Sequence, residues 1–400
     1  MNPGQSSITS AFLWWRLGDR KTRVLLAALF SFLALMAGLS VGAALSGRPY
    51  GDFFAMWTFA RFALSHPAAQ IYDLERLHAF QRLYTPSVGW MPFPYPPYFL
   101  LLLAPLGLAP IGVAWAIWTT GGLGAYLASI FAGRWRRGMA AFAALAPATV
   151  VSLITGQTGL FSSALMIGGA RLMISRPIAA GILFGLMAFK PQLGLLIPVA
   201  LIAARAWRCF WAATATVLSL AAAATAALGP SIWPAWIAAM RRHWEGYVTQ
   251  GNATRLKMPT ITANLELMGV GPQVAQIAQI AVLVAVAAVV WICFRRRVDR
   301  WAVAVLMVGG FLATPYAFFY DLPTLTFAIV LAVAEMARTN RPWHAAEVAV
   351  LLLAFLAPYE PFAAGMLPFP LGASALVLLF IVLARRALAN GTLDAGSDAS

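Results

Sequence analysis

The sequence predicts an all-α polytopic membrane protein with about 12 transmembrane helices. Hydrophobic residues make up 61% of the 400 residues and charged residues only 10%, and the mean hydropathy is +0.78. This composition lies outside the range of soluble domains of this length. Charge-free apolar runs of roughly the 20 residues that cross a bilayer recur at 24–45, 209–228, 274–294 and 301–320.

The lysines and arginines predict the orientation of these spans. They give the chain a net charge of +15, yet they gather in short clusters between apolar runs, as the positive-inside rule describes. The charge therefore reflects membrane topology, and no nucleic-acid partner is expected. Both termini are cytoplasmic if the following basic clusters lie inside: 16–23, 134–137, 171–176, 205–208, 295–300, 338–341 and 385–386.

A single integral membrane domain is expected over residues 1–388, followed by a disordered cytoplasmic tail at 389–400. Two long loops, at about 46–96 and 229–272, lie on the outer face in this topology. The stretches 97–133 and 178–204 do not divide into straight spans of full length. We expect short, tilted or re-entrant helices there, with Lys190 and Pro191 at the tip of a hairpin rather than in lipid.

The first outer loop begins with a carboxylate at the membrane surface. Asp52 directly follows the first apolar run and opens a segment that predicts an amphipathic interfacial helix. On the residue type alone, a helix N-cap is favoured for Asp52 over a general base. Asp73 opens a second amphipathic segment, and there too the N-cap is favoured. The loop ends in a proline-aromatic stretch, 90–98, which either belongs to an aromatic belt or forms a stiff wall that includes Tyr95.

Further polar residues interrupt otherwise apolar sequence. An intramembrane lysine such as Lys190 marks a functional site by default, because its charge is costly unless it is paired or hydrated. Arg255 and Lys257 precede Asn264 in the second outer loop, where they suit a phosphate group or are ordinary solvated charges. Asp321 stands at the mouth of a span, as a cap or as an active-site group.

Several motifs follow one another along the chain: Gly51-Asp52-Phe53 with Trp57, Ile71-Tyr72-Asp73, Phe93-Pro94-Tyr95-Pro96-Pro97, Gly156-Gln157, and 180–191 with Lys190-Pro191. In this order they resemble glycosyltransferase family 87, the group that contains the polyprenyl-phosphate-mannose-dependent α-1,2-mannosyltransferases. The resemblance covers roughly residues 50–325. Near residues 314–321, relatives often carry a histidine where this chain has Phe319, Tyr320 and Asp321.

The resemblance implies a GT-C type membrane glycosyltransferase. It implies inverting transfer of a sugar, with mannose as the first candidate, from a polyprenyl-phosphate donor to a hydroxyl of a glycolipid or envelope glycan. The reaction is expected at the outer face of the bacterial cytoplasmic membrane. Asp52 corresponds to the acidic residue that such enzymes carry in their first outer loop.

The chemistry of such a transfer assigns the remaining roles. Asp52 deprotonates the acceptor hydroxyl, and cations neutralise the leaving phosphate. No cofactor is required, although Asp52 with Asp321 or Asp73 could hold a divalent metal. The phosphate-binding residues are expected to be Lys190, Arg255 and Lys257, and those that bind the sugar or acceptor Tyr95, Gln157, Asn264, Asp321 and Asp73.

Two other functions fit parts of the sequence. A transporter or flippase of lipid-linked sugars would also carry an intramembrane lysine and broken helices. It would, however, place its polar residues at the midplane of two matching halves, whereas here they collect on one face and no repeat is visible. A structural partner of an envelope enzyme is a weaker third alternative. The asymmetric outer loops favour the transferase.

Overall fold

The computed structural model describes residue 38 and residues 50–131, 137–249, 251–339, 344–363 and 370–397. All regular elements in these ranges are helices, and no strand occurs among them. The predicted all-α class is therefore confirmed for this part of the chain. The first apolar run, apart from Gly38, and the basic cluster before it lie outside the described residues.

Five helical segments of the described part are long and apolar enough to cross a membrane. Three of them are α7 (Ile111–Phe131), α13 (Trp207–Leu228) and α17 (Pro272–Arg296). The fourth, Ala345–Phe362, combines α20 (Ala345–Leu356) with η7 (Ala357–Ala363), and the fifth lies in α21 (Gly372–Ser397). The predicted total of about 12 spans is not confirmed. Helix α21 continues beyond residue 388, where the sequence places the end of the membrane domain.

Short apolar helices occupy the stretches that are too short for straight spans. They are α6 (Tyr98–Leu103) with η3 (Ala104–Leu108), α10 (Gly159–Leu172), α11 (Pro177–Leu186) with η4 (Met187–Phe189), η5 (Pro191–Gly194) with α12 (Ile197–Ala203), and α18 (Arg300–Ala313). Lys190 lies between η4 and η5, at the predicted hairpin tip. The elements α8 (Arg137–Leu145), α9 (Pro147–Thr155) and α19 (Pro323–Thr339) complete this part of the fold.

The apolar run 301–320 does not form one straight helix. Helix α18 ends at Ala313, and Thr314 is extended, with φ −106° and ψ 139°. Pro315 explains the break, because a proline disfavours the helical conformation of the residue before it. The chain then reaches the short helix η6 (Phe319–Asp321), which carries Asp321.

Helices also fill both outer segments that the sequence analysis described as loops. The first contains α4 (Phe53–Ser65), η2 (Ala68–Tyr72) and α5 (Leu74–Arg82), and the second contains α14 (Ile232–Thr249), α15 (Asn252–Arg255) and α16 (Ile261–Leu267). The predicted helices after Asp52 and Asp73 therefore exist. The aromatic face of α4, however, is buried in protein, since Phe53, Phe59 and Phe62 are at most 1% exposed.

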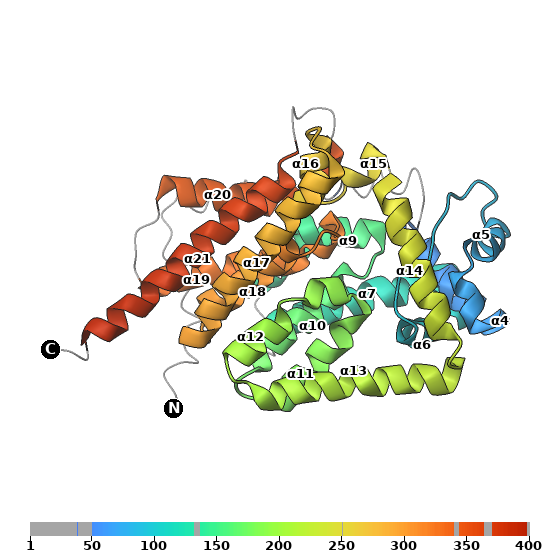
Figure 1. The fold of residues 1–400 in the computed structure, drawn as a ribbon, viewed down its shortest axis with the longest axis horizontal. Coiled ribbons are helices and arrows are strands. Elements are labelled where there is room, and N and C mark those ends of the chain that lie inside the picture. Colours follow the sequence, from blue (N-terminus) through green and yellow to red (C-terminus); the bar gives the residue numbers. More distant parts are fainter. Residues whose placement is uncertain are drawn as a thin grey trace.

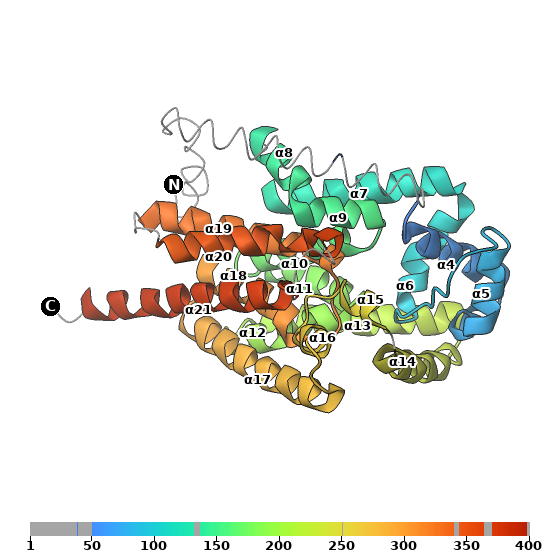
Figure 2. The same ribbon diagram turned by 90° about the horizontal axis from the view of Figure 1, so that it is seen from above.

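The molecule is elongated, with the first outer segment at one end (Figures 1 and 2). Helices α4, α5, α6 and α14 form this end, and α13 leads from it toward α11 and α12. Helices α17 and α21 extend to the opposite end. One hydrophobic core belongs to the outer segment and includes Phe189, while a larger core includes Met187 and Leu193. Lys190 therefore lies where the two cores meet.

Candidate active site

The backbone of Asp52 is held against the end of α9. The amide of Asp52 donates a hydrogen bond to the carbonyl of Thr155, at 2.8 Å. Gly156 ends α9 in the left-handed region, with φ 65°, and a Cβ atom there would stand 2.6 Å from the Cβ of Phe53. Only glycine meets both demands without strain. The indole of Trp118 donates to the carbonyl of Gly156, at 3.0 Å, so this turn is held from a second side.

The carboxylate of Asp52 does not cap α4. Its backbone is helical, with φ −75° and ψ −9°, and no side-chain cap bond forms, whereas an N-cap residue usually has an extended backbone. The N-cap interpretation favoured from the sequence is therefore wrong for this residue. Instead, Oδ2 of Asp52 accepts a hydrogen bond from Nε2 of Gln157, at 3.2 Å. Asp52 is half-buried, and its carboxylate forms no ion pair with a described residue.

Gln157 in turn contacts Tyr95, a third residue of the predicted site. The Tyr95 hydroxyl donates to Oε1 of Gln157, at 3.4 Å. The carbonyl of Tyr95 accepts a hydrogen bond from the Tyr72 hydroxyl, at 2.8 Å. Burial, and to a lesser degree the carboxylates of Asp321 and Asp52, hold the pKa of the Tyr95 phenol above its usual range. The phenol is therefore a hydrogen-bond donor at neutral pH.

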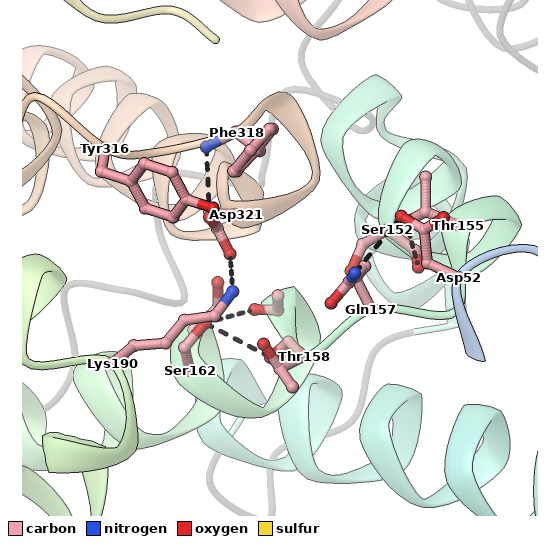
Figure 3. Close-up of polar contacts among 12 residues, drawn as sticks. Asp52, Ser152, Thr155, Gln157, Thr158, Ser162, Lys190, Tyr316, Phe318 and Asp321 are labelled. Carbon is pink, nitrogen blue, oxygen red and sulfur yellow. Dashed lines mark hydrogen bonds and ion pairs between the residues drawn. The ribbon is translucent and has the colours of Figure 1, made fainter. Parts of the chain in front are cut away.

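A second polar centre joins Lys190 to Asp321. Nζ of Lys190 lies 2.5 Å from Oδ1 of Asp321, and both side chains are almost completely buried. Oδ2 of Asp321 accepts a hydrogen bond from the amide of Phe318, at 3.2 Å, and the ammonium lies 5.0 Å from the centroid of the Tyr320 ring. Figure 3 shows Gln157, in this view, between Asp52 and the Lys190–Asp321 pair. Both charges of the pair are thus neutralised inside the protein.

A glycine that the sequence analysis did not use brings the two centres together. A Cβ atom on Gly159 would lie 1.7 Å from the carbonyl oxygen of Tyr320 and 2.8 Å from Oγ of Ser152. Only glycine therefore lets the start of α10 contact the turn that carries Asp321. The signal was present in the sequence as a second glycine three residues after Gly156. The buried Ser152 hydroxyl was also missed.

The two cations of the second outer segment differ in their partners. Arg255 pairs with Glu266 at 2.5 Å, and both side chains are largely buried. Lys257 is exposed and forms no ion pair with a carboxylate of the described residues. Its carbonyl accepts a hydrogen bond from the amide of Phe319, at 3.1 Å, so Lys257 lies beside the turn that carries Asp321.

Two other residues of the predicted site have local structural contacts. Asp73 caps α5, since its side chain accepts from the amide of Arg76, and it also pairs with the Arg76 guanidinium at 3.1 Å. The capping interpretation is confirmed for Asp73. Asn264 is buried, and its amide links the carbonyl of Met258 to the amide of Ala373, at 3.4 and 3.2 Å. The hydrogen bonds of these two residues do not involve Asp52 or Lys190.

The donor set for a metal is limited in the part of the chain that the structure describes. There, no three side chains of histidine, cysteine, aspartate or glutamate gather closely enough to hold a metal ion. Both carboxylate oxygens of Asp321 are already used by Lys190 and Phe318. The expectation that transfer requires no divalent metal stays a prediction.

Comparison with known proteins identifies the family. The profile of glycosyltransferase family 87 matches residues 93–315, more than half of the chain. The match includes Tyr95, Gln157, Lys190 and Lys257, while Asp52 lies outside it. No curated protein and no solved structure matches the chain. The matched region and the apolar helices together show that the chain belongs to glycosyltransferase family 87 and is a membrane glycosyltransferase.

Proposed function

We propose that the protein transfers a sugar, with mannose as the first candidate, from a polyprenyl-phosphate donor to a hydroxyl of a glycolipid or envelope glycan. Asp52 is the observation that carries this proposal, because the residue is only half-buried and its carboxylate has no cationic partner among the described residues. A carboxylate in this state suits a general base.

In the proposed reaction, Asp52 takes the proton of the acceptor hydroxyl. The oxygen of that hydroxyl attacks the anomeric carbon of the donor at the same time. The bond between that carbon and the phosphate oxygen breaks, and polyprenyl phosphate leaves with the electron pair. Attack from the face opposite the phosphate inverts the anomeric configuration. The accessible cation Lys257 stabilises the negative charge that develops on the leaving phosphate.

The contacts of the other predicted cations support Lys257 as the phosphate ligand. Lys190 and Arg255 are each paired with a carboxylate. A phosphate would have to displace those carboxylates, and separation of a buried pair is costly. We therefore assign Lys190 to positioning the turn with Asp321, and Arg255 to holding α15 against α16.

The distribution of charge supports a site on the outer face of the membrane. Helix α17 carries Arg295 and Arg296 in its last turn, and α21 carries Arg385 and Arg386 about midway along its length. The C-terminal end of α17 and the C-terminal half of α21 lie on the side of the molecule opposite α4 and α14 (Figures 1 and 2). Under the positive-inside rule the arginines face the cytoplasm. The first outer segment then faces the periplasm or the cell exterior.

The proposal is tested with purified protein in lipid nanodiscs. It is incubated with a panel of radiolabelled polyprenyl-phosphate sugars and with alkyl glycosides or native membrane lipids as acceptors. We expect transfer from one donor, with inversion seen in the anomeric configuration of the product, and none from the Asp52→Asn variant. Movement of labelled lipid across proteoliposomes without transfer from any donor would overturn the proposal in favour of a flippase.

A further inference from the structure

We infer that Gln157 positions the carboxylate of Asp52 rather than binding the sugar, and that Tyr95 fixes the orientation of Gln157. This inference rests on the proposed function, in which Asp52 is the general base. It changes the role predicted for both residues, which the sequence assigns to sugar or acceptor binding.

The chemistry of the three side chains fixes the direction of the hydrogen bonds. An ionised carboxylate only accepts hydrogen bonds, so the end of the amide that faces Asp52 must be the Nε2 group. Nε2 lies 3.2 Å from Oδ2 of Asp52. The opposite end, Oε1, then faces the Tyr95 hydroxyl at 3.4 Å. A flipped amide would place its oxygen against the carboxylate, which has no proton to donate.

Tyr95 is rigid enough to set this orientation. Its side chain is 5% exposed, and its ring packs against Phe99 with 4.4 Å between ring centroids. Its backbone is held by the Tyr72 hydroxyl. The raised pKa of the Tyr95 phenol, due mainly to burial, keeps the donor proton in place. The chain of contacts thus runs from η2 through Tyr95 and Gln157 to Asp52.

The arrangement leaves one oxygen of Asp52 for chemistry. Oδ2 is held by Gln157, whereas Oδ1 makes no hydrogen bond with a described residue. A single neutral donor on one oxygen fixes the plane of the carboxylate without neutralising its charge. Oδ1 can then accept the proton of the acceptor hydroxyl. Gln157 therefore orients the base and leaves it basic.

Two other titratable groups sense the charge of Asp52. They are the phenols of Tyr95 and Tyr320, and for both burial is the main reason that the pKa lies above its usual range. Both are neutral near pH 7. A change in the acid limb of the pH profile therefore does not come from these phenols, and in Gln157→Glu it belongs to the coupled pair of Asp52 and the new carboxylate.

The test compares three variants with the wild type: Gln157→Met, Tyr95→Phe and Gln157→Glu. Gln157→Met removes a hydrogen bond to a charged group. Because the free energy of such a bond corresponds to about 10- to 100-fold in rate, we expect kcat to fall by this factor with the donor KM unchanged. Tyr95→Phe has a smaller effect in the same direction, because Nε2 can still reach Asp52. Gln157→Glu puts a second carboxylate beside Asp52, so the acid limb of the kcat profile moves to higher pH by about one unit or more. Gln273→Glu, the same exchange at an exposed position of α17, is the matched control.

A sugar-binding role predicts other results. Gln157→Met would then raise the donor KM with little change in kcat, and Gln157→Glu would leave the acid limb where it is. Either result overturns the inference. An infrared titration of the carboxyl groups separates this failure from that of the proposed function, because it needs no donor. The band lost in Asp52→Asn identifies Asp52, and it must titrate at higher pH in Gln157→Glu. An unmoved band contradicts the inference even if no transfer is found.

Discussion

Asp52 and Asp321 are the carboxylates of two neighbouring polar centres, and they differ in burial and in their hydrogen-bond partners. Asp52 is half-buried and receives one hydrogen bond from a neutral amide. Asp321 has a side chain 2% exposed and lies 2.5 Å from an ammonium group, with its second oxygen bound to a backbone amide. A neutral partner orients a carboxylate and leaves its charge, whereas a buried cation cancels it. Chemical availability here depends on the partner rather than on the residue type.

The surroundings of the two residues explain this difference. Asp52 lies at the start of a helix whose N-terminal side meets the α9 turn. Asp321 lies in a turn whose residues Phe319 and Leu322 belong to the larger hydrophobic core, where an uncompensated charge would be costly. Lys190, at the tip of a helical hairpin, has the same problem. Each charge of the pair makes the burial of the other tolerable.

The largest expected effect is on catalysis at Asp52. Loss of a general base costs about 10²- to 10⁴-fold in rate, so we expect Asp52→Asn to lower kcat by at least about 100-fold. The variant should remain folded, because the amide can still pair with Gln157 after rotation. Radiolabel transfer measures kcat, and gel filtration in detergent monitors folding. Glu75→Gln, an exposed carboxylate of the same outer segment, should retain activity. If Asp321→Asn lost more kcat than Asp52→Asn at equal stability, the assigned roles would be reversed.

The next effect is on stability at the second centre. Lys190→Met leaves the buried Asp321 carboxylate without its cation and should lower the free energy of unfolding by about 3–5 kcal/mol. The double variant Lys190→Met with Asp321→Asn should recover much of this loss, because it removes both charges. Thermal unfolding in detergent of the wild type, Lys190→Met, Asp321→Asn and the double variant gives the four free energies of a double-mutant cycle. A double variant as unstable as the sum of the two single variants would show that the pair is not coupled.

The sequence predicted local features well and contacts between distant segments poorly. The break at Lys190, the cap at Asp73 and the short helices of 97–108 and 178–204 follow from periodicity, proline positions and residue type. The family resemblance also identified Asp52, Tyr95 and Gln157 as candidate site residues. It did not show that they form one hydrogen-bonded chain, because Asp52 and Gln157 are 105 positions apart.

The pairing of the charges was likewise invisible in the sequence. Lys190 and Asp321 are 131 positions apart, and nothing local indicates that one neutralises the other. The sequence alone therefore does not distinguish Lys190, Arg255 and Lys257 as phosphate ligands. Only tertiary packing separates two internally paired cations from the exposed one. The same packing explains Gly159, whose missing side chain matters because of Tyr320 in a distant segment.

The smallest expected effect is at Lys257, where the comparison with Lys190 is sharpest. Because Lys257 is exposed and solvated, Lys257→Gln should leave the melting temperature unchanged, unlike Lys190→Met. It should raise the KM for the polyprenyl-phosphate donor by about 10-fold through loss of one charge-assisted contact. Lys257→Arg keeps the charge and should stay near the wild type. Steady-state kinetics with varied donor and fixed acceptor distinguish the two variants, and the effect should weaken as salt screens the exposed charge. Equal donor KM values for wild type and Lys257→Gln would contradict this assignment. The phosphate would then have to bind a paired cation such as Lys190, which must first separate from Asp321.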